Sequence, residues 1–141
     1  MAIVTDRVTI STRGDAEILD VTEKVQALVR EHGFREGQAL VFVSGSTAAL
    51  TTIEYEPGLL QDLPAAFERI APRGIRYQHE EAWHDGNGHS HVRASLLGPS
   101  LTVPFKDGAL LTGTWQQIVL IDFDNRPRRR EVVVQLTGEK G

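Results

Sequence analysis

The sequence predicts a single α+β domain in which mostly antiparallel β-sheets pack as a sandwich, accompanied by about three helices. Three observations lead to this fold class. The length of 141 residues suits one compact domain. Strand-like segments rich in β-branched residues follow one another in runs instead of alternating strictly with helices. No internal repeat, linker or low-complexity segment divides the chain.

Composition narrows the functional classes. Hydrophobic residues make up 40% and charged residues 24% of the chain, which are ordinary globular values. A net charge of −4 argues against a nucleic-acid-binding surface. The chain has neither an apolar run long enough to cross a bilayer nor a signal-peptide pattern, so we expect a cytoplasmic protein without a membrane partner. Because there is no cysteine, any metal must be held by other side chains.

The first half of the chain begins with a strand. Residues 3–12 alternate and are rich in β-branched types, which predicts a half-buried strand. A helix of about three turns is expected to begin near residue 21 and to stop at Gly33, because apolar residues recur at helical spacing between these points. Two strands near 39–44 and 48–55 should follow, separated by a turn at Ser44-Gly45-Ser46.

The second half begins with a helix that Asp62 can cap, with Pro64 in its first turn. The glycines of "GNGHSHVRASLLG" predict a turn followed by a short helix that Gly98 ends. The remaining segments, "PSLTVPF", "GALLTGTWQQIVLIDFD" and "RRREVVVQLTG", are strand-like. The sequence "DNRP" between the last two is typical of a hairpin connection.

Histidines cluster in the segment from residue 79 to residue 91. Four of the five histidines lie there, together with several carboxylates; the histidines are His79, His84, His89 and His91. Imidazole and carboxylate groups are suitable ligands for a divalent ion, although their spacing matches no named zinc motif. A solvated polar loop is the alternative interpretation.

A phosphate site is a second possibility in the same segment. The helix predicted after the turn would present free N–H groups and a favourable dipole to an anion. Asn87 or Ser90 would cap this helix, and His91 would follow in its first turn. Metal binding and anion binding therefore both remain open on the residues alone.

Other candidate residues have plainer alternatives. Glu54 and Glu56 would share a face of a strand and could form a carboxylate pair, or simply a polar surface. Thr47 belongs to a hydroxyl-rich run that is also explained by β-propensity. Trp115, followed by Gln116, stands at a strand entry, where tryptophan usually anchors a core or an interface.

The arginine run from residue 126 to residue 130 could bind phosphate through bidentate guanidinium contacts. On a strand, Arg128 and Arg130 would face one side and Arg129 the other. A charged sheet edge that deters aggregation is the alternative.

Four segments together resemble a known family: "STAALTTIEYEPGLLQDL", "RYQH", "NGHSHVRASLLGPSLTVPF" and "GTWQQIVLIDFDNRPRRREVVVQLTG". In order, spacing and residue type they are similar to the YjbQ-like family of small bacterial and archaeal proteins, whose members are often called secondary thiamine-phosphate synthases. The resemblance spans nearly the whole chain. It implies a homotrimer of α+β subunits with a polar pocket that uses His79 and His91, with Asn87 nearby.

The resemblance also implies a metal site with three histidine ligands, of which this chain lacks one. Many relatives carry a histidine where this chain has Gly45, so His79 and His91 are the only metal ligands that carry over. A divalent ion such as zinc or magnesium would need Glu54, His89, water or a substrate phosphate to complete its shell.

The activity implied by the resemblance joins a pyrimidine diphosphate to a thiazole phosphate with loss of pyrophosphate. On this basis we expect a small phosphorylated substrate. The expected catalytic residues are His79, His91 and Glu54. The expected substrate-binding residues are Asn87, Ser90, Arg93, Trp115, Gln116 and Thr47. The alternatives are a non-enzymatic trimer that binds a metal or metabolite and, ranked last, a hydrolase that uses a histidine-bound metal.

Overall fold

The computed structural model describes all 141 residues and has the predicted α+β architecture. Its eight strands are β1 (Ala2–Thr12), β2 (Glu17–Asp20), β3 (Phe34–Val43), β4 (Ala48–Ile53), β5 (Ser100–Lys106), β6 (Ala109–Leu110), β7 (Gln117–Asp122) and β8 (Arg128–Lys140). Its four helices are α1 (Thr22–Glu31), α2 (Pro57–Ile70), α3 (Gln78–Trp83) and α4 (Gly88–Leu97). None of these helices is long and apolar enough to cross a membrane.

One sheet has five antiparallel strands in the order β1-β8-β3-β5-β6. The alternation predicted for the first strand is present, since inward side chains of β1 are buried or half-buried while their neighbours are exposed. The longest strand, β8, lies between β1 and β3 and is not a sheet edge. The interpretation of the arginine run as a protective edge is therefore wrong.

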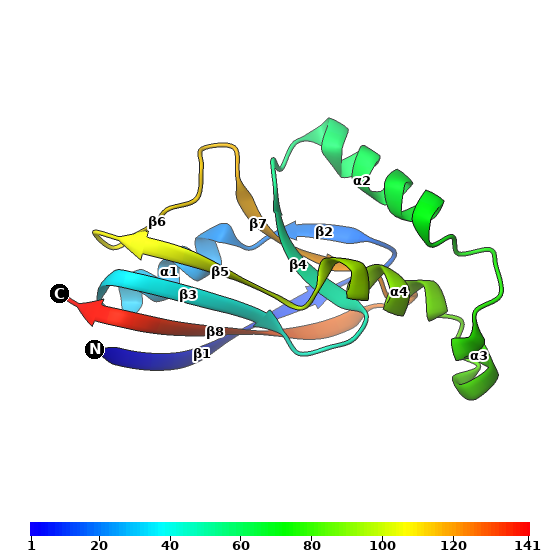
Figure 1. The fold of residues 1–141 in the computed structure, drawn as a ribbon, viewed down its shortest axis with the longest axis horizontal. Coiled ribbons are helices and arrows are strands. Elements are labelled where there is room, and N and C mark those ends of the chain that lie inside the picture. The colour runs from blue at the N-terminus through cyan, green and yellow to red at the C-terminus, as the bar shows by residue number, and fades with distance from the viewer.

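The second sheet has three strands in the order β2-β7-β4 and packs against the first (Figure 1). Its central strand β7 is buried on both faces. Ile118 and Leu120 face the core between the sheets, where α1 also packs, and Val119 and Ile121 face the layer formed by α2 and α4. Burial on both faces explains why this strand reads as a continuous apolar run.

Several predicted boundaries are corrected by the structure. The helix expected to be capped by Asp62 begins six residues earlier, at Pro57, because the Glu56 carboxylate accepts hydrogen bonds from the backbone N–H groups of Gly58 and Leu59. The strand β4 ends at Ile53, so Glu54 and Glu56 form no carboxylate pair on a strand.

Three further elements differ from expectation. The short strand β2 and the short helix α3 were not predicted. The segment "DNRP" is not a hairpin, because β7 pairs with β2 and β4 whereas β8 pairs with β1 and β3. It instead carries the chain from one sheet to the other.

Three connections meet at the end of the molecule opposite the two termini (Figure 1). They are the β3–β4 turn, the β7–β8 connection and the segment from α3 to α4. Backbone hydrogen bonding joins the first two, because the Phe123 N–H donates to the Thr47 carbonyl at 2.9 Å. The third is attached through Asn125, whose side-chain amide donates to the Asp85 carbonyl.

Candidate functional site

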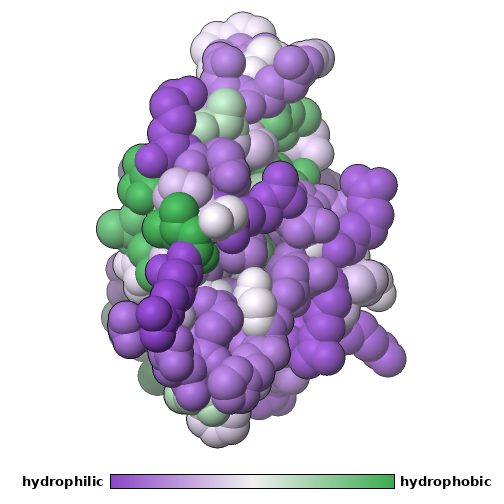
Figure 2. Space-filling view, turned by 90° about the vertical axis from the view of Figure 1, so that its right-hand side faces the viewer, coloured by the Kyte–Doolittle hydropathy of each residue, from purple (hydrophilic) through white to green (hydrophobic).

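The meeting point of these connections contains a polar cavity of about 490 Å³. The cavity is lined by the β3–β4 turn, by α3 and the loop after it, and by the starts of α4 and β8. The lining residues are Gly45, Ser46, Thr47, His79, Trp83, Asp85, Asn87, His91, Arg128 and Arg130. Figure 2 faces this end of the molecule and shows a mostly hydrophilic surface, with hydrophobic residues gathered along one side. The volume and the convergent polar groups are typical of a small-molecule site.

His79 and His91 lie against each other in this cavity. Their ring centroids are 4.3 Å apart, which confirms the predicted convergence of these two residues. His79 comes from α3 and His91 from the first turns of α4. Burial, together with the neighbouring His79, lowers the pKa of His91 below its ordinary value. His91 is therefore neutral near pH 7 and has a ring nitrogen that can accept a proton.

A carboxylate lies beside the histidine pair. Oδ1 of Asp85 is 3.2 Å from Nε2 of His79, within ion-pair distance. The direction of this contact does not satisfy hydrogen-bond geometry, so Nε2 remains a buried atom without a hydrogen-bond partner. A bound molecule, or a small rotation of the His79 or Asp85 side chain, would give Nε2 a hydrogen-bond partner.

Two buried aspartates hold the arginines that line the cavity. Arg130 donates from Nε and Nη2 to the two carboxylate oxygens of Asp122, at 2.7 and 2.8 Å. Arg128 donates from Nε to Asp124 at 2.8 Å. Bidentate contacts with a carboxylate fix the plane of a guanidinium group. Arg130 is therefore held in position before any ligand arrives, whereas Arg128 is held by one hydrogen bond.

Asp124 is the centre of a buried hydrogen-bond network. Its carboxylate also accepts from the Asn125 N–H, from the Asn87 amide and from the Thr47 hydroxyl. Burial by itself would raise the pKa of Asp124, but these hydrogen bonds and that from Arg128 bring its pKa below the ordinary value of 3.8. Asp124 is thus an anion in the folded protein and accepts every one of these bonds.

The orientation of the Asn87 side chain follows from this network. Because a carboxylate only accepts, the Asn87 nitrogen must face Asp124, and its oxygen Oδ1 is left buried without a partner. Asn87 precedes α4, but its side chain caps no backbone group. Ser90 does not cap the helix either, since its hydroxyl donates to the Phe123 carbonyl. The predicted capping roles of both residues are wrong.

The cavity does not supply the ligands that a divalent ion needs. Asp85 lies beside the histidine pair, but no group of three His, Asp or Glu side chains is arranged to hold an ion. The nearest buried carboxylates, Asp122 and Asp124, are engaged with arginines. At the position where relatives carry a third histidine, Gly45 lies beside the Arg130 guanidinium group. The residues present do not fit a resident zinc or magnesium ion.

Some expected site residues lie elsewhere. Arg93 is buried and donates to Glu68 and to the Ala71 carbonyl, which ties α4 to α2. His89 is buried as well, and burial followed by the charge of Arg93 lowers its pKa. Glu54 is exposed after β4 and does not line the cavity. Thr47, in contrast, joins the site and accepts a hydrogen bond from Arg130.

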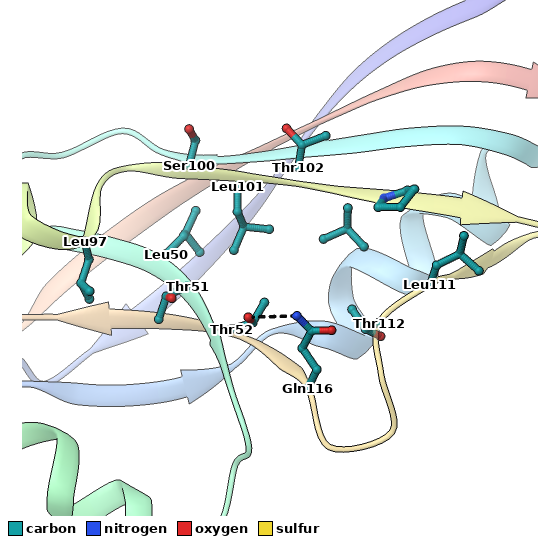
Figure 3. A pocket seen from close by; sticks show the side chains of 12 residues that line it. Leu50, Thr51, Thr52, Leu97, Ser100, Leu101, Thr102, Leu111, Thr112 and Gln116 are labelled. Carbon is teal, nitrogen blue, oxygen red and sulfur yellow. Dashed lines mark hydrogen bonds between the residues drawn. The ribbon is translucent and has the colours of Figure 1, made fainter.

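Gln116 lines a different cavity of about 350 Å³ between β4 and β5. Figure 3 shows Gln116 and Thr52 pointing toward each other, with the Gln116 amide donating to the Thr52 hydroxyl at 3.2 Å. Trp115 is 73% exposed and lines neither cavity, so it is not a core residue of the subunit. Neither residue lies in the histidine cavity.

The sequence reasoning missed Asp122 and Asp124 as site residues. Both belong to "VLIDFD", where carboxylates interrupt an apolar run. A carboxylate is almost never fully buried unless it is paired, so this pattern indicates a buried cationic partner. The nearby arginine run contains that partner, although spacing does not show which arginine turns inward.

The fold and the site define a class: single-domain α+β proteins with two antiparallel sheets and a polar histidine–arginine cavity at one end. The chain belongs to the UPF0047 YjbQ-like family, because the family model described as "UPF0047 protein YjbQ-like" matches residues 6–139.

Known relatives agree with this assignment. A UPF0047 protein of Archaeoglobus fulgidus is 39% identical over 90% of this chain and 96% of its own length. The crystal structure of a YbjQ-like protein of unknown function from Sulfolobus solfataricus P2 superposes with a TM-score of 0.92 at 32% identity, covering 98% of this chain and 99% of the other. A hypothetical protein from Aeropyrum pernix K1 gives a TM-score of 0.89 at 32% identity, covering 96% and 99%.

Proposed function

We propose that the protein is an enzyme that binds a small phosphorylated metabolite in the histidine–arginine cavity and acts on it there. One observation carries the proposal: the His79–His91 pair and the guanidinium groups of Arg128 and Arg130 line the same cavity. Guanidinium groups are strong donors to phosphate oxygens, and a neutral imidazole is a general base or acid near pH 7. Anion binding and proton transfer are thus available side by side.

The resemblance to secondary thiamine-phosphate synthases suggests which reaction to test first. In that reaction a carbon–nitrogen bond forms between the two rings while the carbon–oxygen bond to pyrophosphate breaks. The chemical need is for fixed donors that take up the charge growing on the departing pyrophosphate. Arg128 and Arg130 are placed to supply them, and Trp83 at the cavity rim offers an aromatic surface for a ring.

The test is a direct assay. Purified protein is incubated with the pyrimidine diphosphate and the thiazole phosphate, and thiamine phosphate and pyrophosphate are both quantified. We expect equal amounts of the two products from the wild type and at least about a hundredfold less from His91→Ala, as is usual for loss of a general acid or base. His84→Ala is the matched control, because His84 is exposed and outside the cavity. Equal rates with and without protein would overturn this reaction.

A metabolite-binding protein without turnover is the second candidate. The observation in its favour is that the buried carboxylates nearest the cavity, Asp122 and Asp124, are both engaged by arginines. The histidines are then the principal bases available to a bound molecule. Tight binding of a phosphorylated compound with no product formed would favour this candidate over the enzyme.

We also propose that the subunit assembles as a homotrimer. The apolar runs of β7 and β8 do not support it, because their inward residues are covered within one subunit. Support comes instead from the outward residues of β3, where Leu40 and Phe42 are 37% and 40% exposed on a sheet face that no helix covers. Burying such residues against another copy is favourable.

A further inference from the structure

Arg130 has one guanidinium nitrogen that no protein group uses. Its Nε and Nη2 donate to Asp122, and Nη2 also donates to the Thr47 hydroxyl at 2.6 Å. Nη1 makes no hydrogen bond to the protein, and it is not among the buried polar atoms without partners. Arg130 lines the cavity, and Nη1 is its one guanidinium nitrogen that remains free for a ligand.

Gly45 is what keeps this nitrogen uncovered. Its backbone is not in the left-handed region that favours glycine, so the turn itself would accept another residue. A Cβ atom at this position, however, would lie 2.7 Å from Nη1 of Arg130. The end of an arginine side chain usually moves aside, but this one is held by two bonds to Asp122. A side chain at position 45 would therefore crowd the guanidinium group.

Arg128 adds further free donors to the same cavity. Arg128 uses Nε for Asp124, which leaves its two terminal nitrogens without protein acceptors. Asp122 and Asp124 balance the two arginines in charge, and the Asp85 carboxylate also lines the cavity, so an anion would be recognised by the free N–H groups and not by net charge. A group that only accepts hydrogen bonds, such as a phosphate or diphosphate, matches this arrangement.

We propose that Gly45 and Arg130 form a preset subsite in which Nη1 binds a phosphate oxygen of the ligand directly, without a bridging metal ion. The size of residue 45 then determines whether the cavity accepts the anion. A Cβ atom at residue 45 would lie 2.7 Å from Nη1, so the guanidinium group occupies the space beside Gly45. This inference rests on the proposed function, since both require a phosphorylated ligand.

The experiment compares two glycine variants. Pyrophosphate and inorganic phosphate are titrated by calorimetry, with a chelator present, into the wild type, Gly45→Ala and Gly74→Ala. Gly74 is the matched control, because it also lacks a left-handed backbone and a Cβ there would contact nothing within 4 Å. We expect Gly45→Ala to weaken pyrophosphate binding about tenfold or more, as for one lost charged hydrogen bond, and Gly74→Ala to bind like the wild type.

Arg130→Lys provides a second route to the same answer. Lysine keeps a positive charge beside Asp122 but has no nitrogen equivalent to Nη1, so we expect a similar loss of affinity in a folded protein. If Gly45→Ala and Arg130→Lys bind pyrophosphate like the wild type while His91→Ala binds it weakly, the subsite is wrong and the proposed function stands. If the wild type binds neither anion, both are overturned.

Discussion

Asp122 and Arg130 join the two sheets through a buried ion pair with two hydrogen bonds, from Nε at 2.7 Å and from Nη2 at 2.8 Å. Asp122 is the last residue of β7 in the three-stranded sheet, and Arg130 lies in β8 of the five-stranded sheet. Both side chains are buried. One contact therefore connects the sheets and positions a guanidinium group at the cavity.

Asp122→Asn should destabilise the protein strongly. The variant removes the carboxylate that is hydrogen-bonded to the buried guanidinium group of Arg130 and leaves it only Asp124, at 3.8 Å. Loss of one partner of a buried ion pair typically costs about 3–5 kcal/mol. Urea unfolding of the two proteins measures the difference in free energy. The control is Glu131→Gln, which breaks the exposed ion pair with Arg7 and should cost less than about 1 kcal/mol. Similar losses in the two variants would contradict the structural role of the buried pair.

Asp124 should make the protein sensitive to acid. Its pKa is lower in the folded protein than its ordinary value of 3.8, because hydrogen bonds from Asn125, Asn87 and other donors outweigh the effect of burial. Its contribution to stability is therefore complete above about pH 5 and is lost as the pH falls below 3.8 through the folded pKa.

Urea unfolding between pH 7 and pH 3 checks this expectation. The wild type should lose stability steeply at the acid end, and Asp124→Asn should be less stable at pH 7 but show a shallower dependence on pH. Parallel curves for the two proteins would mean that other carboxyl groups cause the acid sensitivity.

Phosphate should raise the melting temperature of the wild type by mass action. His91→Ala should reduce the rise, because it removes a polar group from the cavity, and His84→Ala should leave it unchanged. A chelator should not alter the rise, since the proposed contacts to phosphate come from side chains and not from a metal. Equal rises in the wild type and His91→Ala would place the anion elsewhere, for example at the exposed Arg126 and Arg129.

The homotrimer is checked by sedimentation at micromolar concentration. The wild type should sediment as a trimer, and Phe42→Glu should sediment as a monomer, because it places a charge on the exposed apolar face of β3. Ile70→Glu, at another exposed apolar position at the end of α2, should remain a trimer. A monomeric wild type would contradict the proposal.

The sequence predicted the fold class and most elements because their signals are local. Alternation in β1, the apolar helical face of α1 and the glycine after α4 each depend on neighbouring residues. The helix start at Pro57 was missed because Glu56 is an unusual capping residue. The short strand β2 was missed because it is too short to show a period.

The resemblance identified the histidine pair, and spacing alone did not. His79 and His91 lie on different helices, so their contact depends on how α3 and α4 are placed by the rest of the fold. Arg93 illustrates the opposite case: its sequence position suggested ligand binding, but the packing of α4 against α2 turns it toward Glu68. Such choices depend on contacts between distant segments.

The sequence by itself determined a single α+β domain, the two faces of β8 and the family to which the chain belongs. Only the tertiary structure decided which polar residues share a cavity. Three residues at the site come from different elements: Asp122 ends a strand, Arg130 belongs to a charged run, and Gly45 lies in a turn. The local sequence around each residue is explained without reference to the other two. They come together because the two sheets meet at this end of the molecule. There the buried carboxylate of Asp122 requires the positive charge of Arg130, and the guanidinium group of Arg130 requires the space beside Gly45.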